Sequence, residues 1–310
     1  MANAAKMAAR TPARILLVGF PKGGKTGSLA CLVDAGFKMR VLDYDGNTES
    51  LIAYVKDKSK LANLDIVHLE DKLRNGQRFV ETVGIPTAFT DGMRLMDRWK
   101  YKDVDGTEVD LGSSNDWGPD TILVLDGMTA QGEAAKRRAM AMMNKTPLNM
   151  SQPVWGLAIG DQMHFIEKMT SPLHRYHIIV TAHPKLISPK DAGKEDSELT
   201  KELKEKVAEL VPTRYFPNAL GQALPQVIGG AFPTILEVTP VYGPGTKVRR
   251  VIRTQPRSDL DVGIPVPNIP AELDISDGMV RIFDALTMGV TASIASGSVP
   301  AATTEGEANA

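Results

Sequence analysis

The sequence has little of what export, disulfide crosslinking or broad nucleic-acid binding requires. Cys31 is the one cysteine among 310 residues, so no internal disulfide can form, and only 5% of residues are aromatic, which leaves few rings to stack on bases. The formal net charge of −1 gives the molecule no overall attraction for a polyanion. It contains no apolar run of about eighteen residues and no apolar signal segment at its start. We therefore expect a cytoplasmic protein without a membrane partner.

What the sequence does have is 43% apolar residues, enough for a substantial core. Apolar stretches of strand length, rich in Ile, Val and Leu, recur at residues 14–20, 39–45, 64–70, 120–127, 177–184, 234–242 and 247–254. Helical patterns separate several of them, for example at 24–35 and 88–101. Strands that are apolar on both faces are typical of a parallel sheet covered by helices on both sides. We predict an α/β fold with a mainly parallel twisted sheet and an antiparallel hairpin, made by the last two strands, at its edge.

Several segments are expected to lie outside this core, which we assign to residues 14–287. An Asp-Gly turn between alternating residues predicts an inserted hairpin at about 100–112. A polar stretch at about 185–215, with a narrow apolar stripe at helical spacing, predicts a mobile loop. Residues 1–13 are expected to be flexible, and the small polar residues of 288–310 to form a disordered tail.

The stretch GFPKGGKT after the first apolar strand matches the phosphate-loop pattern GxxxxGK[ST]. In such a loop, backbone amides point at phosphate oxygens, the lysine reaches the β and γ phosphates, and the hydroxyl of the last residue binds Mg²⁺. The pattern predicts binding of ATP with Mg²⁺, against the alternative of an ordinary glycine-rich turn. The predicted nucleotide-binding residues are Gly19, Phe20, Pro21, Lys22, Gly23, Gly24, Lys25, Thr26 and Gly27. Lys25 is also a catalytic candidate, and Thr26 a metal ligand.

A phosphate loop needs a second anchor for Mg²⁺ at the end of a neighbouring strand. Asp126 follows the nearly uninterrupted apolar stretch TILVL, as the acidic residue of a Walker B motif does. We predict that Asp126 is this metal ligand. The alternative is an aspartate that only caps the turn after the strand.

Asp43 and Asp45 stand in the stretch VLDYDGN, on the next strand after the phosphate loop. In this position the sequence resembles the RecA-like ATPases, whose second strand typically ends in an acidic residue that polarises the attacking water. The resemblance implies that Asp45 is catalytic, in place of the longer Glu that the family usually has. A turn-forming Asp-Gly is the other interpretation of these residues. If Asp45 is not the base, Asp43 and Glu49 are the next candidates.

The resemblance continues at IIVTAHP, which looks like the family's strand that ends in a sensor of the γ-phosphate. His183 occupies the sensor position and is the third catalytic candidate, although a lone histidine can equally be structural. The polar loop at about 185–215 follows it, where the family has a loop that contacts DNA. The resemblance therefore implies a RecA-like core in which nucleotide state and DNA binding are linked.

More narrowly, the ordered motifs between Arg14 and Asp284 resemble phage-encoded RecA-like ATPases of single-strand annealing and recombination. Relatives tend to carry a basic residue after the stretch QPRSDLD, where this chain has Val262 and Gly263. The remaining candidates for a cation that acts on the site of a neighbouring subunit come from the basic run at 247–257. They are Arg250, Arg253 and Arg257.

The sequence thus predicts a DNA-stimulated ATPase that binds single-stranded DNA and self-associates into a filament or ring. Two other classes of protein stay open at this point. A nucleotide or metabolite kinase shares the phosphate loop but needs an acceptor pocket and a lid with arginines. A protein that uses ATP as an assembly switch, with little turnover, is compatible with the shorter acid at position 45.

Overall fold

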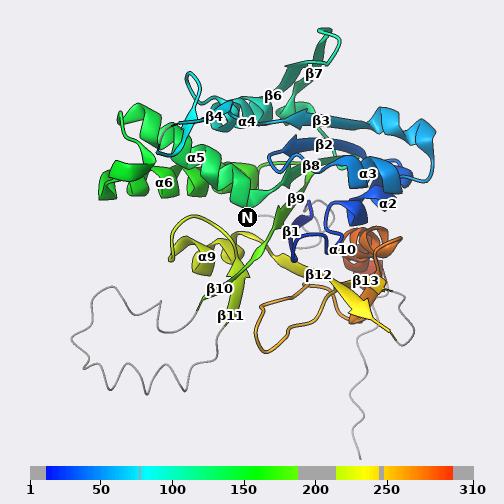
Figure 1. The fold of residues 1–310 in the computed structure, drawn as a ribbon. Helices are drawn as coiled ribbons and strands as arrows, with labels where there is room; N and C mark the ends of the chain where they lie inside the picture. The colour runs from blue at the N-terminus through cyan, green and yellow to red at the C-terminus, as the bar shows by residue number, and fades with distance from the viewer. Residues whose placement is uncertain (1–11, 77, 188–213, 244–247, 296–310) are drawn as a thin grey trace, which may run out of the picture.

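The computed structural model describes residues 12–76, 78–187, 214–243 and 248–295. In this part of the chain the central element is an eight-stranded sheet with the strand order β14-β13-β12-β1-β9-β8-β2-β3 (Figure 1). Its strands are β1 (Arg14–Val18), β2 (Lys38–Asp43), β3 (Leu64–His68), β8 (Thr121–Asp126), β9 (His177–Ala182), β12 (Thr234–Tyr242), β13 (Val248–Arg253) and β14 (Glu272–Asp274). From β12 to β3 the neighbours pair in parallel, whereas β13 and β14 are antiparallel to their neighbours.

All seven strands expected from the apolar pattern are present, and the mainly parallel α/β fold is confirmed. The predicted β12–β13 hairpin also forms, but β14 pairs with β13 and takes the edge of the sheet instead. The three residues of β14, Glu-Leu-Asp, are too few and too polar to produce an apolar strand pattern. Only a strand already in place, β13, makes them part of the sheet.

Helices cover both faces of the sheet. One face carries α2 (Ala30–Asp34), α3 (Glu49–Tyr54) and α10 (Gly278–Ala295), and the other carries α4 (Ala88–Asp97), α5 (Met128–Met142), α6 (Gln152–Met169) and α9 (Leu224–Val227) (Figure 1). In β8, Leu123 and Leu125 join the core beneath α5 and α6, whereas Ile122 and Val124 join the core beneath α2 and α10. Successive strand residues point to opposite faces, so burial of all four reflects a sheet covered twice.

Short helical turns and hairpins complete the described structure. The 3-10 turns are η1 (Gly27–Leu29), η2 (Lys58–Asn63), η3 (Ser114–Asp116), η4 (Pro147–Asn149) and η5 (Ile228–Ala231). The antiparallel hairpins are β4 (Leu73–Asn75) with β5 (Val80–Thr82), β6 (Arg98–Lys102) with β7 (Glu108–Ser113), and β10 (Pro184–Ile187) with β11 (Arg214–Pro217). The β6–β7 hairpin is the insertion expected at about 100–112.

Two predicted helices differ from the observed ones. The helix predicted at 88–101 ends at Asp97, because Arg98 is extended and the following residues pair with β7, which leaves Trp99 buried. The helix predicted at 24–35 begins later, as the turn η1 followed by α2. In both segments the apolar spacing fits a helix. Pairing with β7 makes residues 98–102 a strand, and the geometry of the loop before η1 delays the start of the other helix.

The ends of the chain are more ordered than expected where they are described. Ala13 is buried, and its backbone N–H donates to Nδ1 of His177 over 2.9 Å, so the expected flexibility of 1–13 does not extend to this residue. Helix α10 continues to Ala295, past residue 288, where the tail was expected to begin. The first turns of α10 are anchored in the core by Met279, Ile282 and Phe283, and a helix that has begun extends at little further cost. Residues 1–11 and 296–310 lie outside the described part.

The expected loop at about 185–215 is described only at its two ends, which form β10 and β11, while residues 188–213 lie outside the described part. Within the described residues, no helix is both long and apolar enough to cross a lipid bilayer.

Candidate functional site

The phosphate-loop residues leave the carboxyl end of β1. Lys22 and Gly24 have positive φ angles of 61° and 104°, whereas Gly23 between them does not. Alternation of this kind turns successive backbone N–H groups into a concave nest for anions. A side chain at Gly19 would place its Cβ 2.3 Å from the carbonyl oxygen of Val238, so only glycine fits there. These φ angles and the close approach at Gly19 are compatible with the anion-binding loop that the sequence pattern predicts.

Lys25 and His183 meet beside the first residue of this loop. The Nζ of Lys25 donates to the carbonyl oxygen of Gly19 over 2.7 Å and lies 3.3 Å from Nδ1 of His183. Burial lowers the pKa of Lys25, and burial followed by the charge of Lys25 lowers the pKa of His183. The same Nδ1 also lies 3.3 Å from the carbonyl oxygen of Gly19, so the tautomer of the ring sets whether it accepts from the ammonium or donates to that carbonyl.

Thr26 and Asp126 are in direct contact. The Thr26 hydroxyl donates to the two carboxylate oxygens of Asp126 over 3.2 and 3.0 Å, and the Thr181 hydroxyl donates to Oδ1 over 2.6 Å. Burial raises the pKa of Asp126 to about 6, although the hydrogen bonds from Thr181 and Thr26 oppose the shift. The second metal anchor was expected on a strand next to β1. Asp126 instead ends β8, and β9 lies between β8 and β1. Thr181 of β9 bridges that gap.

Asp45 lies against the residue that follows Asp126. A Cβ on Gly127 would be 2.5 Å from Oδ1 of Asp45, so the carboxyl group packs directly on this glycine. Its Oδ2 is 3.8 Å from Nε2 of His183, beyond hydrogen-bonding distance. Burial raises the pKa of Asp45, while the charges of His183 and Lys25 lower it. Asp45 and His183 therefore face the same space, beside Lys25.

The two other acids of this segment have different surroundings. Asp43 is buried, and its carboxylate accepts hydrogen bonds from the Gly46 amide over 2.8 Å and from the Thr48 hydroxyl over 3.3 Å. These bonds make Asp43 the acid that holds the turn, a role the sequence also allowed for Asp45. Glu49 is exposed and lines the same cavity as Asp45.

A cavity of about 500 Å³ joins these groups. Lys25, Thr26, Asp45, Asp126 and His183, which lie on four separate stretches of chain, all line it. Its walls also contain residues that sequence reasoning did not assign to a nucleotide site of their own chain, among them Tyr54 and Arg250. The ring of Tyr54 lies 3.2 Å from the position of a Cβ on Gly27. No sequence signal identifies Tyr54, because it enters the site through the packing of α3 on η1.

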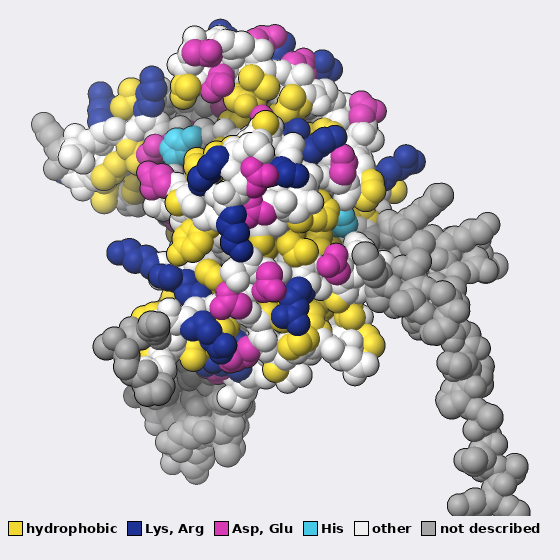
Figure 2. Space-filling model, turned by 90° about the vertical axis from the view of Figure 1, so that its right-hand side faces the viewer, with side chains coloured by type: hydrophobic (Ala, Val, Ile, Leu, Met, Phe, Trp, Pro, Cys, Tyr) yellow, Lys and Arg dark blue, Asp and Glu magenta, His cyan; other side chains and the backbone are white. Residues whose placement is uncertain are grey.

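The basic runs of the sequence are largely neutralised within the described part of the chain. Arg253 and Arg257 pair with the buried Glu237, over 3.3 and 2.9 Å. Three consecutive basic residues of α5 are paired as well: Lys136 with Glu133, Arg137 with Asp71 and Arg138 with Asp161. On the face that Figure 2 draws, Lys and Arg side chains are interspersed with Asp and Glu rather than gathered in one basic patch.

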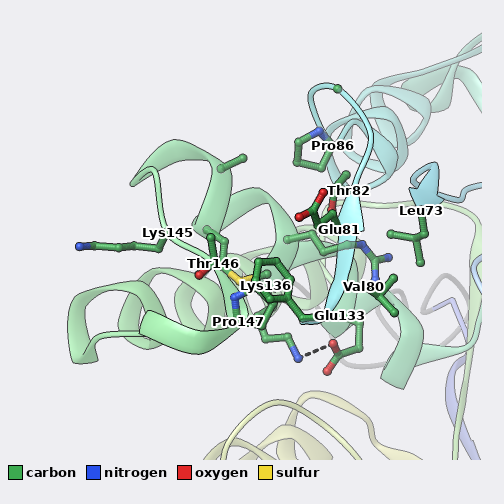
Figure 3. A pocket seen from close by; sticks show the side chains of 15 residues that line it. Leu73, Val80, Glu81, Thr82, Pro86, Glu133, Lys136, Lys145, Thr146 and Pro147 are labelled. Carbon is green, nitrogen blue, oxygen red and sulfur yellow. Dashed lines mark ion pairs between the residues drawn. The ribbon is translucent and has the colours of Figure 1, made fainter. Parts of the chain in front are cut away.

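A second cavity, of about 600 Å³, lies between the β4–β5 hairpin and the carboxyl-terminal part of α5 (Figure 3). Its walls include Leu73, Val80 and Met140, together with the ion pair of Lys136 with Glu133. It shares no lining residue with the cavity at the phosphate loop. It therefore does not provide the adjoining acceptor pocket that a kinase needs.

The donors around Thr26 fit Mg²⁺ that arrives with a nucleotide. Mg²⁺ prefers oxygen ligands, keeps several waters, and is commonly bound by one or two carboxylates together with phosphates. Thr26 and Asp126 supply a hydroxyl and a carboxylate side by side. The described residues contain no group of three or more His, Cys, Asp or Glu side chains that would hold a metal ion without further ligands.

No protein-family model matches this chain, and no curated protein matches it. The resemblance to RecA-like ATPases therefore stays a prediction from the ordered motifs.

The pH dependence of stability tests the burial of Asp126. The unfolded chain releases this proton near pH 3.8, and the folded protein near pH 6, so the cost of the buried charge grows as the pH rises between the two values. Asp126→Asn removes that cost. Relative to the wild type, the variant should gain about 2 kcal/mol of unfolding free energy between about pH 4.5 and about pH 7.5. Urea unfolding without Mg²⁺ or nucleotide measures this difference.

Asp120→Asn is the control for this experiment. The hydrogen bond from Lys38 lowers the pKa of the exposed Asp120, so its stabilising effect is present above its unfolded pKa. Asp120→Asn should therefore lower the free energy of unfolding as the pH rises, by much less than the change expected for Asp126→Asn. An Asp126→Asn variant with the same relative stability at both pH values would contradict the assigned burial effect.

Proposed function

We propose that this chain is a RecA-like ATPase, which binds and hydrolyses ATP and acts on single-stranded DNA in recombination, annealing or replication. The observation that carries the ATPase proposal is the meeting of Lys25, Thr26 and Asp126 at a loop shaped for anions. The Thr26 hydroxyl is within 3.2 Å of both Asp126 oxygens, and the Lys25 ammonium lies over the loop carbonyls. Cation, hydroxyl and carboxylate are the side chains that phosphate-loop ATPases use for Mg²⁺ and the terminal phosphates.

In this proposal each side chain has a separate task. Lys25 leaves the carbonyl oxygens of Gly19 and Phe20 to bind the β and γ phosphate oxygens. Thr26 and Asp126 hold Mg²⁺, which when bound neutralises charge on the phosphates. Asp45 orients the attacking water and accepts its proton, and its raised pKa makes it a stronger base than an exposed aspartate. His183, with its Nε2 toward Asp45, contacts the γ-phosphate.

A path from the nucleotide to the proposed DNA loop supports the DNA part of the proposal. The carbonyl oxygen of His183 accepts from the Asn218 amide over 2.7 Å, and β10 begins at the next residue. Strand β11, which pairs with β10, is the other end of the 185–215 segment. Its Tyr215 ring packs edge to face on the ring of Phe20 in the phosphate loop, with the ring centroids 5.8 Å apart. A displacement of His183 or of Phe20 would therefore shift β10 or β11, the two ends of the 185–215 segment. DNA phosphates would bind Lys side chains of that segment, whose middle lies outside the described residues.

Linkage between ATP and DNA is the experimental test of this proposal. ATP should tighten single-stranded DNA binding by the same factor by which DNA tightens ATP binding. His183→Ala should remove that factor, because the ring is the contact between phosphate and loop. Labelled single-stranded DNA is titrated with a non-hydrolysable ATP analogue, with ADP and without nucleotide, at low and high salt. Affinity should fall with salt, since phosphate contacts release counterions.

His174→Ala is a matched control, because that ring bonds the Lys168 carbonyl oxygen and does not line the nucleotide cavity. Equal DNA affinity in all three nucleotide states would reject the coupling. Absence of DNA binding at low salt would reject the DNA function and leave the kinase alternative.

We also propose that the ATP-bound form self-associates into filaments or rings. Head-to-tail contact of one surface patch with a different patch produces such assemblies. Light scattering with the ATP analogue and DNA should detect them, and a strict monomer under these conditions would contradict the proposal.

A further inference from the structure

Arg250 of β13 lies over the phosphate loop of its own chain. A Cβ on Gly24 would be 2.7 Å from Cδ of Arg250 and 3.6 Å from its Nε, so the arginine occupies the space that this glycine leaves open. Arg250 also lines the 500 Å³ cavity together with Lys25, Thr26 and Asp126. In the sheet, β12 lies between β13 and β1. The side chain of Arg250 therefore extends past β12 to the loop that follows the carboxyl end of β1.

The neighbouring arginines are engaged elsewhere, whereas Arg250 is not. Arg249 and Arg253 pair with Glu272, and Arg257 pairs with Glu237 and Asp259. Among the described residues no carboxylate forms an ion pair with Arg250, and its side chain is half-buried. A half-buried guanidinium without an acidic partner is a strong site for an anion, because its five N–H donors match phosphate oxygens in pairs.

Strand geometry explains this difference. Arg250 and Ile252 point to one face of the sheet, where Ile252 packs in the core beneath α10, and Arg249, Val251 and Arg253 point to the other. The Gly24 side of that core also contains Ile275, whose Cδ1 is 3.5 Å from the same Cβ position. The Ile275 amide also donates to the carbonyl oxygen of Arg250 over 3.4 Å, so Arg250 lies between Ile275, which follows β14, and the phosphate loop.

We propose that Arg250 binds the phosphates of the nucleotide held by its own chain, so that each protomer supplies its own arginine. This inference rests on the proposed ATP site and adds the source of its second cation. An arginine of this kind stabilises the charge of phosphoryl transfer whether it comes from the same chain or from a neighbour. The short approach to Gly24 favours the same chain, because a guanidinium in that position needs no neighbouring subunit to reach the phosphates.

The first experiment compares three variants by titration of a labelled, non-hydrolysable ATP analogue. Arg250→Ala should weaken binding by about 10- to 100-fold, the usual range for loss of a charge-assisted hydrogen-bonding pair. Arg250→Lys, which keeps the charge, should recover part of this loss. Arg249→Ala is the matched control on the same strand, and because its side chain is 60% exposed and faces away, it should bind like the wild type.

The second experiment distinguishes an arginine of the same chain from one of a neighbour. Lys25→Ala and Arg250→Ala proteins are mixed in equal amounts, and ATP turnover is measured. If Arg250 acts on a neighbour, about one quarter of the contacts in a random head-to-tail assembly join an intact Lys25 to an intact Arg250, and turnover returns. If Arg250 acts on its own chain, every site lacks one cation, and the mixture turns over ATP no faster than the sum of the two separate variants, as we expect.

The outcomes separate this inference from the function on which it rests. Wild-type protein that binds the analogue while Arg250→Ala binds it equally well would overturn the role of Arg250 alone. Recovery of turnover in the mixture would overturn its action within one chain. Wild-type protein that does not bind the analogue would overturn both the ATP site and this inference.

Discussion

Lys25→Ala is expected to reduce ATP turnover by about 100-fold or more, because it removes the cation that neutralises the terminal phosphates. The fold should stay intact. Lys25 is buried with a lowered pKa, so its ammonium contributes desolvation cost rather than core packing. The measurements are steady-state ATP hydrolysis and the midpoint of thermal unfolding without nucleotide.

Lys38→Ala is the matched control for Lys25→Ala. Lys38 begins β2 at the opposite edge of the sheet, and its ion pair with Asp120 is more than half exposed on both sides. Such a pair contributes about 1 kcal/mol or less to stability, so this variant should keep both turnover and fold. If Lys25→Ala hydrolyses ATP at the wild-type rate, the proposed role of the phosphate loop in ATP hydrolysis is wrong.

Asp45→Asn is expected to slow hydrolysis by about 100- to 10,000-fold while ATP binding stays near the wild-type value. The amide keeps the size and the contact with Gly127 but cannot accept a proton from water. Single-turnover hydrolysis and analogue titration separate these two effects. Asp126→Asn should show the opposite pattern, with weaker Mg²⁺-dependent binding, since Asp126 touches the metal-binding hydroxyl of Thr26.

Glu49→Gln is the comparison that identifies the base. Glu49 lines the same cavity but is exposed, so its loss should change hydrolysis little. If Glu49→Gln is slow and Asp45→Asn is normal, Glu49 is the base and the role of Asp45 is wrong. Asp43→Asn is a poor probe, because Asp43 holds the turn through Gly46 and Thr48 and its loss changes the fold of the loop.

The fold was largely predictable because the central strands are buried on both faces. A strand such as β8, with every residue buried, must be apolar throughout, and that pattern is visible without any partner. Strands that depend on a neighbour for their conformation are not visible in this way. β14 is three residues long, and β6 has the spacing of a helix, so only pairing with β13 and β7 determines them.

The sequence by itself determined the phosphate-loop pattern and the strands β2, β8 and β9 that lead to Asp45, Asp126 and His183, because each depends on residue types at short spacing. Tertiary structure decided which groups meet. Asp126 lies two strands from β1, yet Thr26 and Thr181 both reach it. Arg250 lies more than 200 residues from Gly24 in the chain and still packs on it. Such contacts depend on strand order and on the face to which a side chain points, and both are set only when the sheet assembles.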